Sequence, residues 1–172
     1  MTLGFTQYFP SGEKTYFQEK IKACEESVSV CTEMKFDRGI LPVMIYTTMK
    51  PKRHTMRIGN RFKSGMKLHM VYGNRTKNRT QFALMTCTST QTVVIRYRRT
   101  AAVNRHEGVE NINYTAMVGN QFLQVFIDGN LIGGRTLARL AVNDGFKNTT
   151  EFLKWFRKSG KFQLIHWTNL RY

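Results

Sequence analysis

The stretch from Lys50 to Lys67 holds seven positive charges and no carboxylate. Because like charges repel, a chain keeps such a run most readily where an anion neutralises it. Within the stretch, Lys52 precedes the hydroxyl of Thr55 by three positions, and Arg57 follows Thr55 by two. An unprotonated lysine can serve as the base for a hydroxyl nucleophile, and an arginine can stabilise an oxyanion or hold a phosphate. The stretch predicts an anion site and leaves open whether that site is catalytic or a solvated basic loop.

The spacing also limits how these groups can meet. In an extended chain, Arg53, Thr55 and Arg57 project to the same side. Lys52 can reach Thr55 only across a bend in the chain. From position 38 to position 106 the chain has fifteen Lys or Arg residues and neither Asp nor Glu. A carboxylate that works beside Thr55 must therefore come from outside this segment.

The net charge of +16, from 27 basic and 11 acidic residues, exceeds what solubility requires. Nucleic acid is the natural partner for such charge, so we expect the chain to bind RNA or a nucleotide-like ligand through a basic cleft. We favour this function over an enzymatic one because it needs no perturbed pKa. Two alternatives stay open: charge spread evenly over the surface, and docking of an acidic protein partner. The candidate nucleic-acid-binding residues are Lys50, Lys52, Arg53, Arg57, Arg61, Lys63, Arg75, Lys77 and Arg79.

The composition predicts one folded domain spanning residues 1–172. The chain is 41% hydrophobic and 12% aromatic, and 172 residues suffice to bury a core. No apolar run approaches the ~20 residues that cross a bilayer, and the first ten residues lack the pattern of a signal peptide. The three cysteines include no C-x-x-C pair, which favours a reducing compartment. The four histidines are scattered without the spacing of metal ligands, so the sequence implies no metal or other cofactor. We therefore expect a soluble, cytoplasmic protein that does not contact a membrane.

Hydrophobic periodicity predicts the elements of the N-terminal half. Apolar residues recur at helical spacing from Glu13 to about Cys31, so a strand and an amphipathic helix are expected to occupy residues 1–36. Turn-forming residues predict a loop at 32–42 and a basic turn at 73–80. Alternating apolar and polar residues predict strands at 3–8, 43–49 and 67–72, and a hairpin formed by 82–88 and 92–98.

The C-terminal half starts with a polar segment, 100–113, which we expect to be a surface loop or an insertion. A strand is predicted at 121–127, followed by a turn at Asp128–Asn130. A short helix around 137–141 is expected to end at Gly145, and Asn148 followed by Glu151 has the spacing of a capping box that opens another helix. With a last strand at 162–167, the chain is predicted to be α+β, with a curved, barrel-like sheet at about 43–172 and flanking helices.

Three segments, in order along the chain, carry a family resemblance. They are Lys52–Arg57 (KRHTMR), similar to a G-R-K-T-x-T-I-R motif, Arg61–Leu68 (RFKSGMKL), similar to R-W-K-x-G-D-x-L, and Ala141–Phe146 (AVNDGF), similar to A-x-x-E/D-G-F before a helix that continues at Glu151–Phe156. These are motifs of the ASCH domain family, whose β-barrel is related to the PUA domain of RNA-binding proteins. The resemblance covers most of the chain after about Ile45, and the closing Ile165–Tyr172 most resembles phage or prophage members.

The resemblance implies a cleft along the barrel that is lined with basic residues and suited to RNA or a nucleotide. In a bacterial branch of the family that hydrolyses N4-acetylcytidine, a lysine, a threonine and a glutamate act together. Lys52, Thr55 and Asp144 match them, and are the candidate catalytic residues if the chain is an enzyme. Asp144 is one methylene shorter than the glutamate, and Lys50 and Pro51 replace a glycine of the family motif. Other members are proposed ribonucleases or transcription coactivator modules, which are further alternatives.

If hydrolysis occurs, each of these residues has a role that its chemistry allows. Thr55 is the candidate nucleophile and needs a base, which Lys52 supplies only when unprotonated. Arg57 or Arg61 would stabilise the oxyanion. Asp144 would orient Lys52 or exchange a proton with the leaving group.

Overall fold

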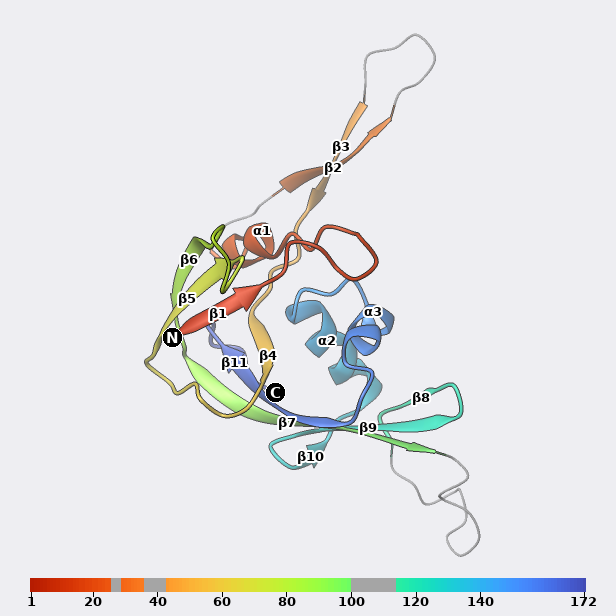
Figure 1. Cartoon of the computed structure of the whole chain (residues 1–172). Helices are drawn as coiled ribbons and strands as arrows, with labels where there is room; N and C mark the ends of the chain where they lie inside the picture. The colour runs from red at the N-terminus through yellow and green to blue at the C-terminus, as the bar shows by residue number, and fades with distance from the viewer. Residues whose placement is uncertain (26–28, 36–42, 100–113) are drawn as a thin grey trace, which may run out of the picture.

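The computed structural model describes residues 1–25, 29–35, 43–99 and 114–172, and the described part is a mixed α+β fold, as predicted (Figure 1). Most of its elements are strands, and three helices accompany them. The strands are β1 (Thr2–Phe5), β2 (Ser29–Lys35), β3 (Val43–Thr48), β4 (His54–Ile58), β5 (Lys67–Tyr72), β6 (Thr80–Thr86), β7 (Ser89–Arg99), β8 (Ala116–Val118), β9 (Gln121–Ile127), β10 (Asn130–Leu131) and β11 (Gly160–His166). The helices are α1 (Phe17–Lys22), α2 (Gly134–Asn143) and α3 (Thr149–Trp155).

The strands pair as three sheets. One has the order β1-β5-β6, with β1 parallel to β5, and a larger one has the order β10-β9-β7-β11-β4, with β8 also paired to β9. The third is the two-stranded ribbon β2-β3, which extends away from the other two in Figure 1. Among the described strands, no backbone pairing joins the three-stranded sheet to the larger one, so the pairing does not close a barrel.

The predicted hairpin at 82–88 and 92–98 is wrong, because its two halves belong to different sheets. β6 pairs with β5, whereas β7 pairs with β9 and β11. The chain crosses between the sheets at Cys87, whose amide donates to the carbonyl of Met66, and at Thr88, whose amide donates to the carbonyl of His166. Cys87 is fully buried. Its burial, between the sheets, is what separates two strands that are adjacent in sequence.

Two hydrophobic cores meet at β11. Because successive side chains of a strand point to opposite faces, Leu164 packs into the core beneath α2 and α3, while Ile165 packs into the core beside β1, β5 and α1. The same alternation applies to β4, which pairs antiparallel with β11 and places Met56 opposite Leu164 and Thr55 opposite Ile165. Met56 belongs to the first core. The neighbours of Met56 along β4 therefore face β1 and α1.

The N-terminal helix is much shorter than the predicted 13–31. Tyr16 has a left-handed backbone (φ 52°), and the Thr15 hydroxyl donates to the carbonyl of Thr6 at 2.8 Å, so the helix begins only at Phe17. It ends at Lys22, and the residues from Ser29 form β2 instead. The β-branched and alternating residues of this segment favour a strand once β3 is available as a partner. β2 also replaces the first part of the loop predicted at 32–42, and residues 36–42 lie outside the described residues, as does the loop predicted at 100–113.

Several other predictions are confirmed. β3, β5, β9 and β11 lie where strands were predicted, at 43–49, 67–72, 121–127 and 162–167. The Asn148 side chain accepts a hydrogen bond from the amide of Glu151 at 3.0 Å and so caps α3. α2 ends at Asn143, and Gly145 follows with φ 91°. No helix in the described part of the chain has the length and the apolar character needed to cross a membrane.

Candidate functional site

The side chain of Thr55 points into the interior, because β4 turns it away from the core that holds Met56. Only 2% of Thr55 is exposed. Arg57, two positions further along the strand, lines the same cavity as Thr55, as the alternation predicts. Arg53 precedes the strand and is exposed, so it does not share this side with Thr55 and Arg57.

Lys52 lies at a bend before β4 and lines the same cavity as Thr55, and several hydrogen bonds hold that bend in place. The amide of Lys52 donates to the carbonyl of Lys20 at 2.8 Å, and its carbonyl accepts from the indole of Trp167 at 3.1 Å. The Lys52 side chain is 1% exposed, and its ammonium lies 4.7 Å from the centre of the Phe17 ring. The backbone contacts on both sides of the bend fix the direction in which Lys52 enters the interior.

Asp144 supplies the carboxylate from outside the acid-free segment. It is the C-terminal cap of α2 and is 2% exposed. Its carboxylate forms an ion pair with the Lys52 ammonium, and its backbone carbonyl accepts a hydrogen bond from the same nitrogen. Gly145 has φ 91°, and a Cβ atom there would lie 2.9 Å from the Phe17 ring. A glycine is thus required both for the turn and for the close approach of α1 to the Asp144 backbone.

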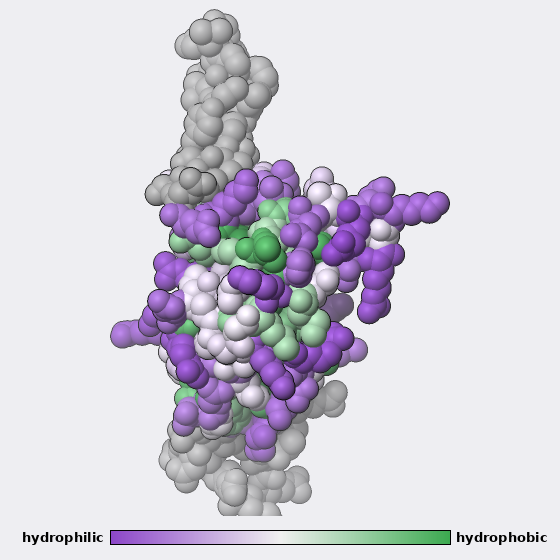
Figure 2. All heavy atoms as spheres, turned by 90° about the vertical axis from the view of Figure 1, so that its left-hand side faces the viewer, coloured by the Kyte–Doolittle hydropathy of each residue, from purple (hydrophilic) through white to green (hydrophobic). Residues whose placement is uncertain are grey.

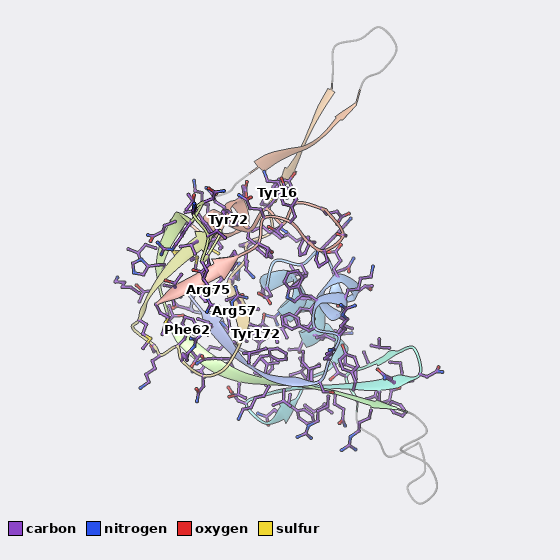
Figure 3. All side chains as sticks on the ribbon, viewed as in Figure 1. Tyr16, Arg57, Phe62, Tyr72, Arg75 and Tyr172 are labelled. Carbon is purple, nitrogen blue, oxygen red and sulfur yellow. The ribbon has the colours of Figure 1, made fainter. Side chains whose placement is uncertain are left out.

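The three candidate catalytic residues meet in one small cavity. Lys52, Thr55 and Asp144 all line a space of about 60 Å³, together with Arg57. Arg57 donates to the carbonyl of Gly4 at 2.6 Å and to that of Met56 at 3.1 Å. Figure 3 shows Arg57 toward the middle of the molecule, inside the arc that the sheets form. Two cations, a hydroxyl and a carboxylate therefore share a space large enough for a few non-hydrogen atoms.

Burial changes the acidity of the groups in this cavity. It lowers the pKa of Lys52 to about 8, although Asp144 acts in the opposite direction; the charges of Arg57 and Lys20 lower it further. Burial raises the pKa of the Asp144 carboxyl, while Lys52, Arg57 and a hydrogen bond from Thr55 lower it. Near neutral pH a fraction of Lys52 is therefore the free amine that a base requires.

Aromatic rings form the remaining walls of the cavity. They come from four separate parts of the chain, and sequence reasoning did not assign them to the site. Nothing in their spacing marks them, because aromatic residues at such positions are also what a core requires. The rings are those of Phe5, Phe17, Phe146, Trp155 and Phe156.

The other candidate nucleic-acid-binding residues do not line this cavity. All seven have exposed side chains, so they remain available to a partner at the surface. Three of them belong to the turn between β5 and β6, on the side of the molecule that Figure 2 shows, where hydrophilic residues predominate. The seven are Lys50, Arg53, Arg61, Lys63, Arg75, Lys77 and Arg79.

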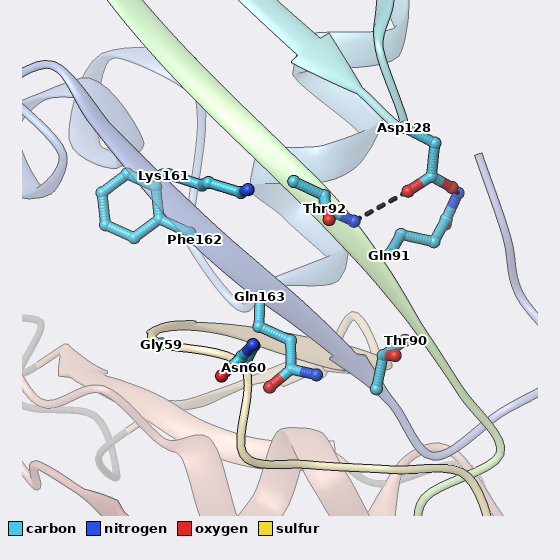
Figure 4. A pocket seen from close by; sticks show the side chains of 9 residues that line it. All are labelled: Gly59, Asn60, Thr90, Gln91, Thr92, Asp128, Lys161, Phe162 and Gln163. Carbon is cyan, nitrogen blue, oxygen red and sulfur yellow. Dashed lines mark hydrogen bonds between the residues drawn. The ribbon is translucent and has the colours of Figure 1, made fainter.

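A second polar hollow, of about 370 Å³, lies beside β7 and β11 and contains none of the candidate site residues (Figure 4). The side chains of Gln91, Asp128 and Gln163 are bonded to one another or to the backbone. Gln91 donates to the Asp128 carboxylate at 2.9 Å and to the carbonyl of Tyr172 at 2.9 Å, and Gln163 donates to the carbonyl of Phe62 at 2.7 Å. These bonds fasten the C-terminal residue and the β4-β5 connection to the larger sheet.

The described residues contain no group of three or more His, Cys, Asp or Glu side chains placed to hold a metal ion. Comparison of the chain with family models, with curated proteins and with solved structures gives no match.

Proposed function

We propose that this chain hydrolyses the exocyclic amide of an N-acylated cytosine nucleoside, such as N4-acetylcytidine. The observation that carries the proposal is the meeting of Lys52, Thr55 and Asp144 in one buried cavity. A binding surface for phosphates gains nothing from burying a lysine beside a hydroxyl. A hydrolase requires this arrangement, because it needs a nucleophile within reach of a base whose pKa lies near neutrality.

Each step of the reaction has a residue in the cavity. The Thr55 oxygen attacks the acyl carbon and transfers its proton to the free amine of Lys52. Arg57 stabilises the oxyanion, and Lys52 then gives the proton to the departing exocyclic nitrogen as the carbon–nitrogen bond breaks. A water molecule then gives a proton to the free amine of Lys52 and attacks the acyl ester of Thr55. The carboxylic acid leaves, and Lys52 returns the proton to the Thr55 oxygen, which restores the hydroxyl. Asp144 holds the Lys52 nitrogen beside Thr55 throughout.

The size and lining of the cavity favour a small acyl group on a planar base. A space of about 60 Å³ suits an acetyl group but not a nucleoside. Trp155 is 38% exposed and borders the cavity, so its ring offers a flat apolar surface for a base that stays outside. This division places the acyl carbon beside Thr55 and leaves the base at the entrance.

We also propose that the fold is the PUA-like barrel of the ASCH family. What supports this is the curvature of the two main sheets around a common interior in Figure 1, together with α2 and α3 on one side of it. Two of the segments that resemble the family motifs, Lys52–Arg57 and Ala141–Phe146, also supply the charged and hydroxyl side chains of the cavity.

Turnover of N4-acetylcytidine to cytidine, followed by chromatography, tests the hydrolase. The unmodified chain is expected to release cytidine, and Thr55→Val, which keeps the shape of the side chain but removes the hydroxyl, is expected to lose ~10³-fold or more in kcat. Thr90→Val is the matched control, since Thr90 lies on β7 outside the cavity. Full turnover by Thr55→Val would show that Thr55 is not the nucleophile, and no turnover by the unmodified chain would exclude this substrate.

Binding of RNA without hydrolysis is the second candidate function. The seven exposed cations outside the cavity, in a chain of net charge +16, favour it. In a fluorescence-anisotropy titration with a labelled single-stranded RNA, Arg61→Glu with Lys63→Glu should weaken binding and reduce its salt dependence. Competition separates the possible partners: displacement by unlabelled RNA and DNA but not by poly-glutamate would favour a nucleic-acid site. Binding of labelled poly-glutamate by a chain that does not bind the labelled RNA would favour an acidic protein partner.

A further inference from the structure

A hollow of about 410 Å³, distinct from the one beside β7 and β11, adjoins the Lys52 cavity. Arg57, Trp155 and Phe156 line both spaces, so the two meet at these residues. Pockets for small ligands commonly have volumes of ~300 to 1,000 Å³, a range that the hollow reaches and the Lys52 cavity does not. The adjoining hollow therefore offers space for the other parts of a substrate whose acyl group enters the cavity.

The hollow has the chemical character that a sugar phosphate requires. Ile58 is 81% exposed beside it, and Trp155 forms another apolar wall. Arg157 and Lys158 also line it with exposed side chains, and none of the lining residues is acidic. The Trp155 ring can pack against the C–H face of a sugar, and two cations with no acid among the lining residues suit a phosphate.

The segment that carries the two cations is anchored at both ends. The Tyr97 hydroxyl donates to the carbonyl of Phe156 at 3.0 Å, and the amide of Tyr97 donates to the Ser159 hydroxyl at 2.9 Å. Arg157 and Lys158 are the two residues between these anchors. Their backbone is thus fixed to β7 before any ligand arrives, which reduces the entropy lost on binding.

We propose that this hollow is a phosphate subsite, in which Arg157 and Lys158 bind the phosphate on the ribose of the substrate. This inference rests on the proposed function and narrows the substrate from a nucleoside to a nucleotide. The phosphate can belong to a free nucleotide or to an RNA chain, since the recognising chemistry is the same.

Calorimetric titration with cytidine, cytidine 5′-monophosphate and the trinucleotide CCC tests the subsite without requiring turnover. The monophosphate is expected to bind ~10-fold more tightly than cytidine, which corresponds to one good charge-assisted contact. Arg157→Glu with Lys158→Glu should abolish this ratio and leave the affinity for cytidine unchanged. A gain for the monophosphate alone would indicate a free nucleotide, and an equal gain for the trinucleotide would indicate RNA.

Lys22→Glu with Arg135→Glu is the matched control, because it changes the net charge equally at exposed residues outside both spaces. It should keep the monophosphate ratio. Equal affinities of cytidine and the monophosphate in the unmodified chain, or no binding of either, would overturn the subsite. Preferential binding of the monophosphate without any turnover of N4-acetylcytidine would instead refute the proposed hydrolysis and retain the subsite. Arg157→Gln with Lys158→Gln gives the same comparison if the charge-reversed chain does not fold.

Discussion

Lys52 and Asp144 form a buried ion pair between residues 92 positions apart in the chain. Each side chain is almost fully enclosed, and the pair joins the bend before β4 to the C-terminal end of α2. Removing two charges from water is costly, so a pair of this kind adds little net stability over apolar residues. A chemical role therefore explains the presence of the Lys52–Asp144 pair better than a gain in stability does.

The first prediction concerns the two halves of this pair. Asp144→Leu leaves the Lys52 amine buried without an anion and is expected to lower the free energy of unfolding by about 3–5 kcal/mol at pH 7. Lys52→Met with Asp144→Leu removes both charges and should recover most of the loss. Urea denaturation of the three chains checks this. Equal losses in the single and double variants would show that the carboxylate stabilises the fold by other contacts.

The penalty in Asp144→Leu, relative to the unmodified chain, should shrink as the pH rises to about 8, above which Lys52 of the unmodified chain has also lost its proton. Removal of the carboxylate lowers the pKa of Lys52 in the folded chain further, below the value of about 8 in the unmodified chain. In the unfolded chain Lys52 keeps its proton up to a pKa of 10.5. Between these values the unfolded state binds the additional proton, so raising the pH stabilises the folded state by up to about 1.4 kcal/mol per pH unit. Repeating the denaturation at pH 7, 8 and 9 measures the slope.

A second prediction concerns Lys20, which is a positioning residue for the proposed reaction. Its ammonium donates to the carbonyl of Gly145 at 2.7 Å, and its charge is among the causes that lower the pKa of Lys52. kcat/KM should rise with pH as Lys52 loses its proton near pH 8. In Lys20→Met the pKa of Lys52 rises, so this limb should move to higher pH, while Lys22→Met, exposed on the same helix, should leave it in place. A lower rate with an unshifted profile would indicate a structural role alone.

Parts of the fold and of the site could be predicted because local chemistry decides them. β5 and β9 were found from alternation, because each has a buried face that fixes which residues are apolar. Asn148 and Glu151 marked the start of α3, since the capping contact lies within four residues. The spacing of Lys52 and Thr55 identified two of the catalytic candidates, and the resemblance supplied Asp144.

What could not be predicted depends on contacts that are distant in the sequence. The helix predicted through Cys31 fails because β3 offers a strand partner, which periodicity within one segment does not reveal. β6 and β7 have the pattern of a hairpin, and only the burial of Cys87 between two sheets separates them. Trp155 belongs to the helix predicted to continue at Glu151–Phe156, and its place at the cavity depends on how α3 packs.

A third prediction uses two glycines with nearly the same backbone. Gly145 has φ 91° and Gly129 has φ 88°, so an alanine at either position is strained by about 1–2 kcal/mol. A Cβ at Gly129 meets nothing within 4 Å, whereas one at Gly145 lies 2.9 Å from the Phe17 ring and 3.1 Å from the Lys52 side chain. Gly145→Ala should therefore lose more stability than Gly129→Ala, and only Gly145→Ala should reduce kcat. Equal losses in urea denaturation would mean that Phe17 and Lys52 move aside freely.

The last prediction concerns two histidines that face each other across β4 and β11. The rings of His54 and His166 are both 0% exposed, with centroids 5.3 Å apart. His54 bonds to the Tyr172 hydroxyl at 2.9 Å, and neither ring nitrogen of His166 has a hydrogen-bond partner among the described residues. A proton on either ring would place a positive charge in a site without a compensating carboxylate in contact.

Burial lowers the pKa of His166 to about 4, aided by Arg171 and opposed by Asp128. It lowers the pKa of His54 well below the usual value of 6.5, and Lys52 and His166 act in the same direction. Below pH 6.5 both histidines bind a proton in the unfolded chain but not in the folded chain. The free energy of unfolding therefore falls as the pH decreases toward 4. From pH 7 to pH 5 the loss should be about 2 kcal/mol for each histidine.

The carboxylates contribute equally to the pH dependence of stability in a histidine variant and in the unmodified chain. The difference between the two chains from pH 7 to pH 5 therefore gives the contribution of the histidine alone. His166→Gln is expected to be less stable at pH 7, because the amide is also buried, but to lose about 2 kcal/mol less than the unmodified chain between pH 7 and pH 5. A slope that His166→Gln does not reduce would mean that the His166 ring accepts a proton within the fold.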